Sequence, residues 1–180
     1  AREIEALLPL VDWGGVEWNG HAIRLPRSGM EIDFGGIGKE YAADRAAAIA
    51  IAAGIAHGYV NLAGDVRVWG GRPEGAPWRV GIRHPRIEGE TIGGIEIADG
   101  AVATSGDYER CFDVGDRRYC HILDATTGWP VQGWRSVSVA APLCVVAGSG
   151  ATVGMLLGDE APAWLDAQGV DWLGVDAAGH

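Results

Sequence analysis

The chain has 180 residues, enough for one domain with a hydrophobic core and too few for two large domains. Apolar residues make up 48% and charged residues 21%, as in an ordinary soluble protein, and no apolar run reaches the roughly 18 residues of a membrane span. The net charge of −10, without a basic cluster, argues against nucleic-acid binding, so an anionic ligand would need backbone N–H groups, a few placed cations or a metal.

The first third of the chain is predicted to form a hairpin, a strand and a helix. Asn19-Gly20 lies between two short apolar segments and is a strong signal for a hairpin turn. Residues 30–34 alternate like a strand and run into a glycine-rich turn. From Lys39 the apolar spacing becomes that of a helix, which we expect to end at Gly54.

The remaining two thirds are rich in short strands, with helices close to the end. Strands are expected at residues 59–62, 66–69, 78–82, 91–97, 102–103, 118–123, 136–141 and 170–175, and helices at 144–157 and 161–167. Many of these strands follow one another in hairpin order, and nothing in the sequence resembles a linker. We therefore predict an α+β fold with a mostly antiparallel sheet and inserted helices, in one domain over residues 1–180.

The glycine-rich turn at residues 33–41 is the first candidate ligand site. Glycines ahead of a helix expose backbone N–H groups, and the helix dipole adds partial positive charge at that end. Lys39 adds a full positive charge that can meet a phosphate or a flavin carbonyl. The segment matches neither the dinucleotide fingerprint nor the P-loop. A tight turn with a solvated lysine explains the same residues, so both interpretations stay open.

The second candidate is the run Thr104-Ser105-Gly106-Asp107, expected at the end of a strand. Hydroxyl and backbone N–H groups in such a run can bind phosphate oxygens. Asp107 can accept hydrogen bonds from a ligand amide or hydroxyl. The alternative is a turn that these same side chains stabilise within a hairpin.

His121 is the candidate general base. It lies on a predicted strand, just before Asp124 and the Thr127-Gly128 turn. A carboxylate beside a histidine can orient one ring nitrogen while the other takes a proton. A lone histidine on an alternating strand is more often a hydrogen-bonded core residue, so this segment does not decide the question by itself.

Taken together, four segments resemble the FAD:protein FMN transferase (ApbE-like) family. In the family's order, the matching segments are residues 33–39, 61–65, 103–108 and 121–130. The resemblance implies an ApbE-like, T-fold-related core that binds FAD with a magnesium ion, Mg2+, at the pyrophosphate. It also implies transfer of FMN to a Ser or Thr hydroxyl of an acceptor flavoprotein, with release of AMP.

The resemblance also assigns roles to single residues. His121 would help to deprotonate the acceptor hydroxyl, while Lys39 and Asp107 would position the flavin nucleotide. The backbone carbonyl of Gly38 and the hydroxyl of Thr152 match two of the family's metal ligands. The other residues expected to contact FAD are Gly64, Asp65, Thr104, Ser105, Gly106, Asp124 and Thr127.

Three departures from the family pattern affect this expectation. Gly148 stands where the family has a metal-binding aspartate, four residues before Thr152, so the metal site is expected to be weakened or rebuilt, with Asp124 as a substitute ligand. Ala125 replaces a proline of the family pattern, which loosens that turn. Little of the family's large upstream region precedes the motif that begins at Asp33.

Two other functions stay open at this point. One is an FAD pyrophosphatase that uses water in place of an acceptor protein. The other is an FAD-binding protein that lost metal-dependent turnover together with the aspartate. The chain begins at Ala1 without a leader-like segment, so we expect that an upstream segment was removed or that the chain is a domain cut from a longer protein. The family resemblance implies the bacterial periplasm or cell envelope.

Overall fold

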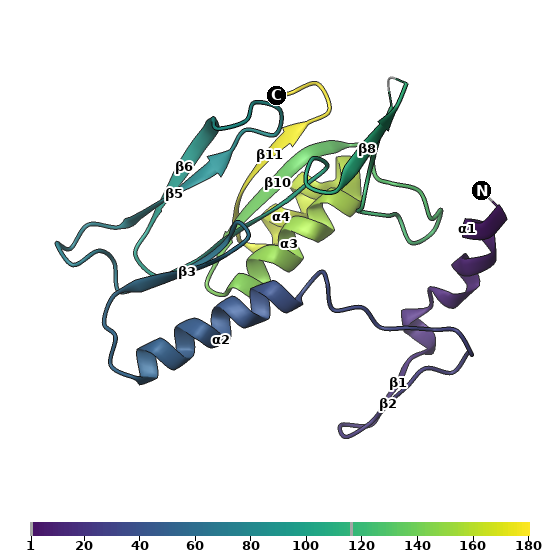
Figure 1. The fold of residues 1–180 in the computed structure, drawn as a ribbon, viewed down its shortest axis with the longest axis horizontal. Helices are drawn as coiled ribbons and strands as arrows, with labels where there is room; N and C mark the ends of the chain where they lie inside the picture. The colour runs from purple at the N-terminus through teal and green to yellow at the C-terminus, as the bar shows by residue number, and fades with distance from the viewer. Residues whose placement is uncertain (1, 116) are drawn as a thin grey trace.

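The computed structural model describes residues 2–115 and 117–180, and its centre is an antiparallel sheet of five strands (Figure 1). The strand order is β11-β10-β7-β4-β3, and every neighbouring pair is antiparallel. The α+β fold with a mostly antiparallel sheet is therefore confirmed. The strands are β3 (Gly58–Leu62), β4 (Asp65–Trp69), β7 (Gly100–Gly106), β10 (Trp134–Ala141) and β11 (Asp171–Asp176).

Three helices cover one face of this sheet: α2 (Gly38–Ala52), α3 (Cys144–Leu157) and α4 (Ala161–Gln168) (Figure 1). Helix α3 packs on β7 and β10, and α2 packs on β3 and β4 beside it. The core lies between the helices and the sheet, where Val137, Val139 and Met155 are fully buried. All three helices were expected from the sequence. In the described part of the chain, no helix has the length and apolar character needed to cross a membrane.

Three separate hairpins extend from this body. The Asn19-Gly20 hairpin is confirmed, because the Asn19 side chain accepts the backbone N–H groups of His21 and Ala22 at 3.0 and 2.8 Å. The hairpins are β1 (Glu17–Trp18) with β2 (Ile23–Arg24), β5 (Trp78–Arg83) with β6 (Thr91–Ile97), and β8 (Cys111–Val114) with β9 (Arg117–Cys120). The strand expected at 118–123 thus ends earlier, at Cys120.

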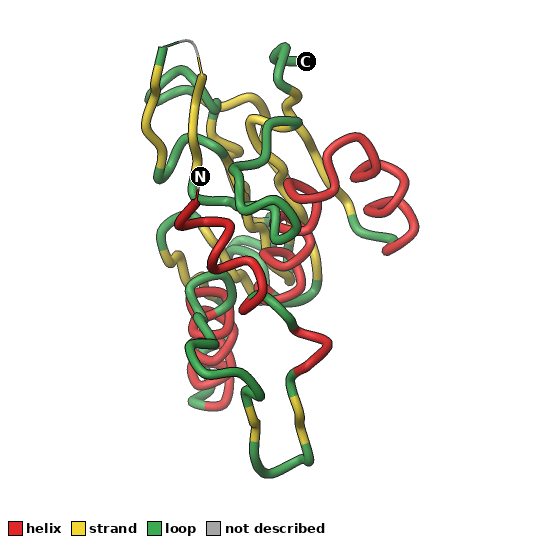
Figure 2. The backbone as a smooth tube through the Cα atoms, turned by 90° about the vertical axis from the view of Figure 1, so that its right-hand side faces the viewer, coloured by secondary structure: helices red, strands yellow, loops and turns green. Residues whose placement is uncertain are grey.

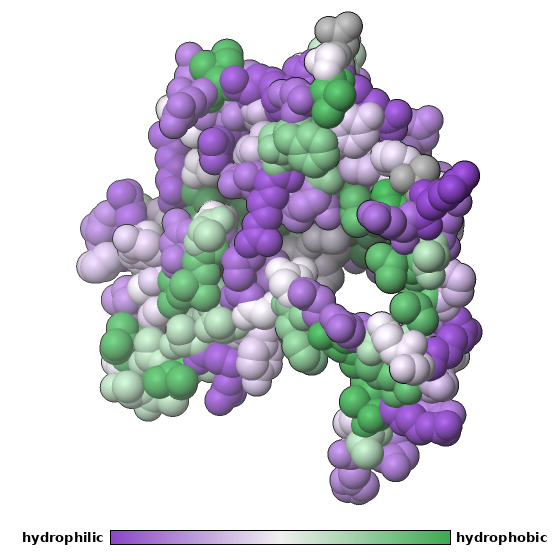
Figure 3. Space-filling view, turned by 45° about the vertical axis from the view of Figure 1, so that its right-hand side comes forward, coloured by the Kyte–Doolittle hydropathy of each residue, from purple (hydrophilic) through white to green (hydrophobic). Residues whose placement is uncertain are grey.

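The N-terminal segment lies apart from the sheet and contacts the turn that contains Gly128. Its elements are α1 (Arg2–Leu7) and the 3-10 turns η1 (Leu8–Leu10) and η2 (Trp13–Gly15) (Figure 2). Ile4 and Leu8 close on Gly128, where a Cβ atom would lie 2.3 Å from Ile4 Cγ2. In the space-filling view an opening passes between this segment and the body (Figure 3).

The prediction of a strand at residues 30–34 is wrong. These residues alternate between half-buried and exposed positions, as a strand with one covered face would. Within residues 2–115 and 117–180, however, no strand pairs with them. Alternation records which side is covered, whereas a strand also requires a neighbour for its backbone hydrogen bonds.

The start of α3 is held by a side chain from α2. Asp44 accepts the backbone N–H groups of Cys144 at 2.8 Å and of Val145 at 3.0 Å, across 100 residues of sequence. On β4, the Nε atom of Arg67 lies 3.6 Å from the same carboxylate. The first N–H groups of a helix lack partners within the helix and carry partial positive charge, so this carboxylate stabilises α3 and ties it to α2 and β4.

Replacing Asp44 by alanine should lower the free energy of unfolding by about 2–3 kcal/mol. Two partly buried helix N–H groups would lose their acceptor, and Arg67 would lose one of its two carboxylate partners. Urea denaturation followed by circular dichroism measures the change. Asp159→Ala, at an exposed acidic position, is the control and should stay within about 0.5 kcal/mol of the parent. Equal effects of the two substitutions would contradict the assigned role.

Candidate active site

Two predicted site residues, Lys39 and Asp65, meet where the start of α2 approaches β4. The Nζ atom of Lys39 lies 2.6 Å from Oδ2 of Asp65. Asp65 is the first residue of β4, and its side chain is only 4% exposed. The preceding turn, Ala63-Gly64, has positive φ angles of 54° and 97°, which is the backbone of a tight two-residue hairpin and accounts for glycine at this position. This turn fixes the point at which Asp65 enters the sheet.

The surroundings of Lys39 stabilise its protonated, positively charged form. Partial burial alone would lower the pKa of Lys39, but the hydrogen bond and the negative charge of Asp65 outweigh it, and the pKa lies above its usual value. About half of the Lys39 side chain, 48%, is accessible to solvent. It is therefore a fixed cation that faces solvent and can meet an anionic ligand.

The hydroxyl groups of Thr104 and Ser105 lie on opposite faces of β7. Ser105 faces α3, and its Oγ atom lies 2.9 Å from Oγ1 of Thr152. Thr104 faces away from that helix, and its hydroxyl lies 2.8 Å from the Ser138 hydroxyl on β10. Both hydroxyls bond to other elements, so they do not form the local turn considered as an alternative. The Ser105–Thr152 pair brings two predicted residues together on the helix-covered face.

Glu40 is a site residue that the sequence analysis missed. It is only 6% exposed, and its Oε2 atom has no hydrogen-bond partner among the described residues. Burial raises the pKa of Glu40, and the neighbouring Asp65 carboxylate raises it further. The available signal was the helical spacing, which places Glu40 on the same inner face of α2 as the buried Ala43 and Ala47.

The Glu40 side chain occupies the space in front of Gly148. A Cβ atom built on Gly148 would lie 2.5 Å from Cγ and 2.8 Å from Oε1 of Glu40. Gly148 is therefore the position on α3 over which a carboxylate from α2 lies. Atoms of Glu40, and not of Asp124, are the nearest ones to this position.

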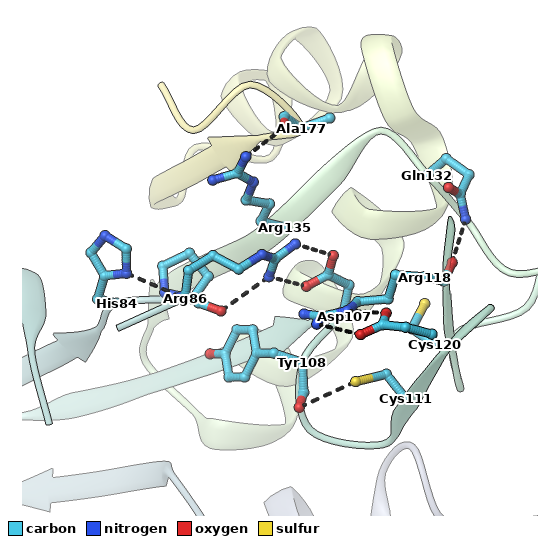
Figure 4. A network of polar contacts seen from close by, with 12 residues as sticks. His84, Arg86, Asp107, Tyr108, Cys111, Arg118, Cys120, Gln132, Arg135 and Ala177 are labelled. Atoms are coloured by element: carbon cyan, nitrogen blue, oxygen red, sulfur yellow. Dashed lines mark hydrogen bonds and ion pairs between the residues drawn. The ribbon is translucent and has the colours of Figure 1, made fainter. Parts of the chain in front are cut away.

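Asp107 directly follows β7 and forms an ion pair with an arginine. Two parallel bonds, both 2.7 Å long, join the Arg86 guanidinium to the Asp107 carboxylate (Figure 4). The two residues come from different segments, since Arg86 follows β5. Gly106 allows the Tyr108 ring to approach, because a Cβ there would lie 2.4 Å from it. Arg86 was not expected from the sequence, and any ligand that Asp107 binds must share this carboxylate with it.

The third predicted group, His121 with Asp124 and Thr127, lies in a separate turn. His121 is exposed and follows the end of β9. Asp124 accepts the Thr126 N–H at 2.8 Å and the Thr126 hydroxyl at 2.7 Å, and these bonds lower the pKa of Asp124. Among the described residues no ion pair joins His121 to Asp124, so the carboxylate that was expected to orient the histidine instead organises its own turn.

The carboxylates near Gly38 and Thr152 are too few to form an all-carboxylate metal cage. Across residues 2–115 and 117–180, no group of three or more His, Cys, Asp or Glu side chains has the spacing of a metal site. Two oxygen groups lie along one face of α3: the Glu40 carboxylate lies over Gly148, and the Thr152 hydroxyl is one turn further along the helix. Hard divalent cations accept such mixed oxygen donors, together with backbone carbonyls and water.

The family relationship follows from comparison of the whole chain. The sequence model of the ApbE family matches residues 1–173. The chain belongs to the ApbE family. Membership of one family accounts for the pairing of Lys39 with Asp65 and of Ser105 with Thr152, although the partners are far apart in sequence.

Known ApbE-family proteins are similar in sequence and in fold. The FAD:protein FMN transferase of Rhodobacter capsulatus is 37% identical over 142 residues, covering 78% of this chain and 27% of that protein. The FAD:protein FMN transferase of Vibrio cholerae is 36% identical over 133 residues, covering 73% and 40%. The crystal structure of the ApbE protein of Thermotoga maritima superposes with a TM-score of 0.90 at 36% identity, covering 99% and 60%. The matched part of the chain thus covers less than half the length of these two curated relatives.

Replacing Gly148 by alanine should lower the free energy of unfolding by about 1–3 kcal/mol, because the new methyl group collides with Glu40. Gly150→Ala is the matched control on the same helix. Its methyl group would lie at an ordinary 3.5 Å from Val139, so helix propensity should stabilise the protein by up to about 1 kcal/mol. Urea denaturation measures both changes.

The same experiment tests the assigned contact through a double-mutant cycle. In a Glu40→Ala background the clash disappears, so Gly148→Ala should no longer be costly. If Gly148→Ala costs the same with and without the Glu40 side chain, the contact does not determine the effect.

Proposed function

We propose that this chain carries the catalytic core of an FAD:protein FMN transferase, which moves FMN from FAD to a Ser or Thr hydroxyl of an acceptor protein and releases AMP. The observation that carries the proposal is that two pairs of predicted site residues, Lys39 with Asp65 and Ser105 with Thr152, are in contact on a chain of this family. Its relatives named FAD:protein FMN transferase support the choice of reaction.

The start of α2 suits the anionic part of FAD. Because the chain has a net charge of −10, its overall electrostatic field repels a pyrophosphate. The N-terminus of the fifteen-residue helix α2 supplies partial positive charge, and the Ile37 side chain at its N-cap position does not cap it. Lys39 adds a full charge on a side chain that Asp65 holds in place. Local donors at this helix end thus offset the unfavourable charge of the whole molecule.

A divalent cation is part of the proposal, and the residues present fit it. The unpartnered Oε2 atom of Glu40 is a buried acceptor of the kind that a cation satisfies. The Thr152 hydroxyl and the Gly38 backbone carbonyl are the other oxygen donors that would hold the ion. When bound, Mg2+ would neutralise charge on the pyrophosphate and favour departure of AMP. The requirement for magnesium itself stays a prediction.

His121 is proposed as the general base. Its ring is exposed at the surface, where the hydroxyl of a large acceptor protein can reach it. The acceptor oxygen forms a bond to the phosphorus of the FMN phosphate as the phosphorus–oxygen bond to AMP breaks. The proton of the hydroxyl passes to the His121 ring, and AMP leaves with the bonding electron pair. The identity of the acceptor and the periplasmic location remain proposals drawn from the family.

His121→Ala should reduce flavin transfer by about 100-fold or more, because a positioned general base contributes roughly that factor. FAD affinity should be unchanged, since the Lys39–Asp65 contact lies in other segments. Transfer is measured by mass spectrometry of a threonine-containing acceptor peptide incubated with the protein, FAD and magnesium chloride. Affinity is measured by quenching of FAD fluorescence.

His21→Ala is the matched control, because His21 is exposed in the β1–β2 hairpin and belongs to no part of the proposed site. It should transfer flavin at the parent rate. Normal transfer by His121→Ala would reject the assigned base. AMP release by the parent protein at the same rate without any acceptor would instead identify a pyrophosphatase.

A further inference from the structure

We propose that Glu40 supplies the carboxylate ligand of the divalent cation from helix α2, in place of the carboxylate that α3 lacks at Gly148. The inference rests on the proposed magnesium-dependent function and deepens it. It would make the site of this chain a rebuilt metal site in which the ligand has moved from one helix to its neighbour.

The first argument is the unsatisfied oxygen of Glu40. Its Oε2 atom has no partner among the described residues, and 94% of the residue is shielded from solvent. A buried carboxylate without a partner is costly, and native proteins leave few such groups unless an ion or a water satisfies them. The position of Glu40 therefore indicates that a cation completes this environment.

The second argument is that neighbouring carboxylates already have their own partners. Asp65 accepts from Lys39 at 2.6 Å. Asp44, one turn further along α2, accepts two N–H groups of α3 and lies beside Arg67. Glu40 lies in the first turn of α2, near Lys39, but its Oε2 atom is buried without a hydrogen-bond partner among the described residues. A divalent cation would supply the missing positive charge.

The third argument is the space in which the carboxylate lies. Because the Cγ atom of Glu40 would be 2.5 Å from a Cβ atom at Gly148, a side chain at 148 and the present Glu40 conformation exclude each other. Residues 148 and 152 are one turn apart on α3, so they lie on the same face of the helix. Glu40 thus presents its carboxylate at the helix surface that also carries the Thr152 hydroxyl.

The donor set suits a hard cation and not a soft one. Carboxylate, hydroxyl and carbonyl oxygens are the ligands that Mg2+ and Mn2+ prefer, and Mg2+ usually takes only one or two protein carboxylates. The ion completes its coordination with water and ligand phosphates. A site with Glu40 as its principal carboxylate is therefore consistent with the absence of a three-residue acidic cluster from the described residues.

The competing explanation is that Glu40 is a neutral, purely structural carboxylic acid. Glu40→Gln separates the two, because glutamine has the same shape and carries no charge. A structural role predicts that metal affinity is unaffected. A ligand role predicts that metal affinity falls while the metal-free protein keeps its stability toward urea, since glutamine removes a buried charge that no protein group satisfies.

The experiment titrates the purified protein with Mn2+ and follows the free ion by electron paramagnetic resonance, once with protein alone and once with saturating FAD. Glu40→Gln should weaken Mn2+ binding by roughly 10-fold or more in the condition where the parent binds. Glu88→Gln, at an exposed position, is the control and should bind as the parent does. Unchanged affinity in Glu40→Gln, or no Mn2+ binding by the parent in either condition, would overturn the inference.

A second variant moves the ligand back to α3. Glu40→Ala should lose Mn2+ affinity, and adding Gly148→Asp to it should recover most of the loss, because the space in front of residue 148 is then free. A folded double variant that binds no better than Glu40→Ala would count against the exchange of positions. Urea denaturation of each variant shows whether it is folded.

Flavin transfer by the parent, assayed in parallel, separates this inference from the proposed function. Transfer by the parent together with unchanged Mn2+ affinity in Glu40→Gln would reject the Glu40 ligand and keep the transferase. Loss of Mn2+ affinity in Glu40→Gln without any transfer by the parent would keep the ligand and reject the reaction.

Discussion

The site depends on the contact between the Asp44 carboxylate and the first N–H groups of α3. Asp44 fixes the start of α3 against the middle of α2, and Arg67 joins the same carboxylate from β4. Glu40 lies one turn before Asp44, on the same face of α2. Once Asp44 is bound to the helix end, Glu40 is placed over the next turn of α3, at Gly148. The cap therefore sets the register in which the two helices present their side chains to each other.

Small residues on α3 make this close approach possible. Gly150 and Gly154 face the valines of β10, and a Cβ atom at Gly154 would lie only 3.0 Å from Val137. Each glycine inside a helix costs up to about 1 kcal/mol of helix propensity relative to alanine. Burial of the valines and of Met155 against a closely packed helix offsets that cost. Gly148 differs, because it makes room for a charged side chain of a neighbouring helix and not for the sheet.

The sequence allowed the sheet-forming strands and the three packed helices to be predicted, because their periodicity follows from burial on one side. It failed at residues 30–34, where alternation occurs without a partner strand. In the site, the loss of an acidic residue at 148 was visible, but the substitute was sought at Asp124. The structure places the Glu40 side chain in front of residue 148. Local patterns do not state which side chains of two helices about 100 residues apart will meet, since that depends on how the helices pack.

The chemistry of the site then follows from where charge is left unbalanced. Lys39 with Asp65 and Asp44 with the end of α3 are balanced pairs, and they hold the backbone in place. Glu40 is different, because its Oε2 atom is buried without a partner among the described residues, and an unsatisfied buried oxygen is unfavourable. Functional sites commonly retain such unfavourable groups, whose cost the surrounding fold must exceed. In this chain the contact of Asp44 with the start of α3 stabilises the packing of α2 against α3. The same contact holds the Glu40 carboxylate in position over Gly148.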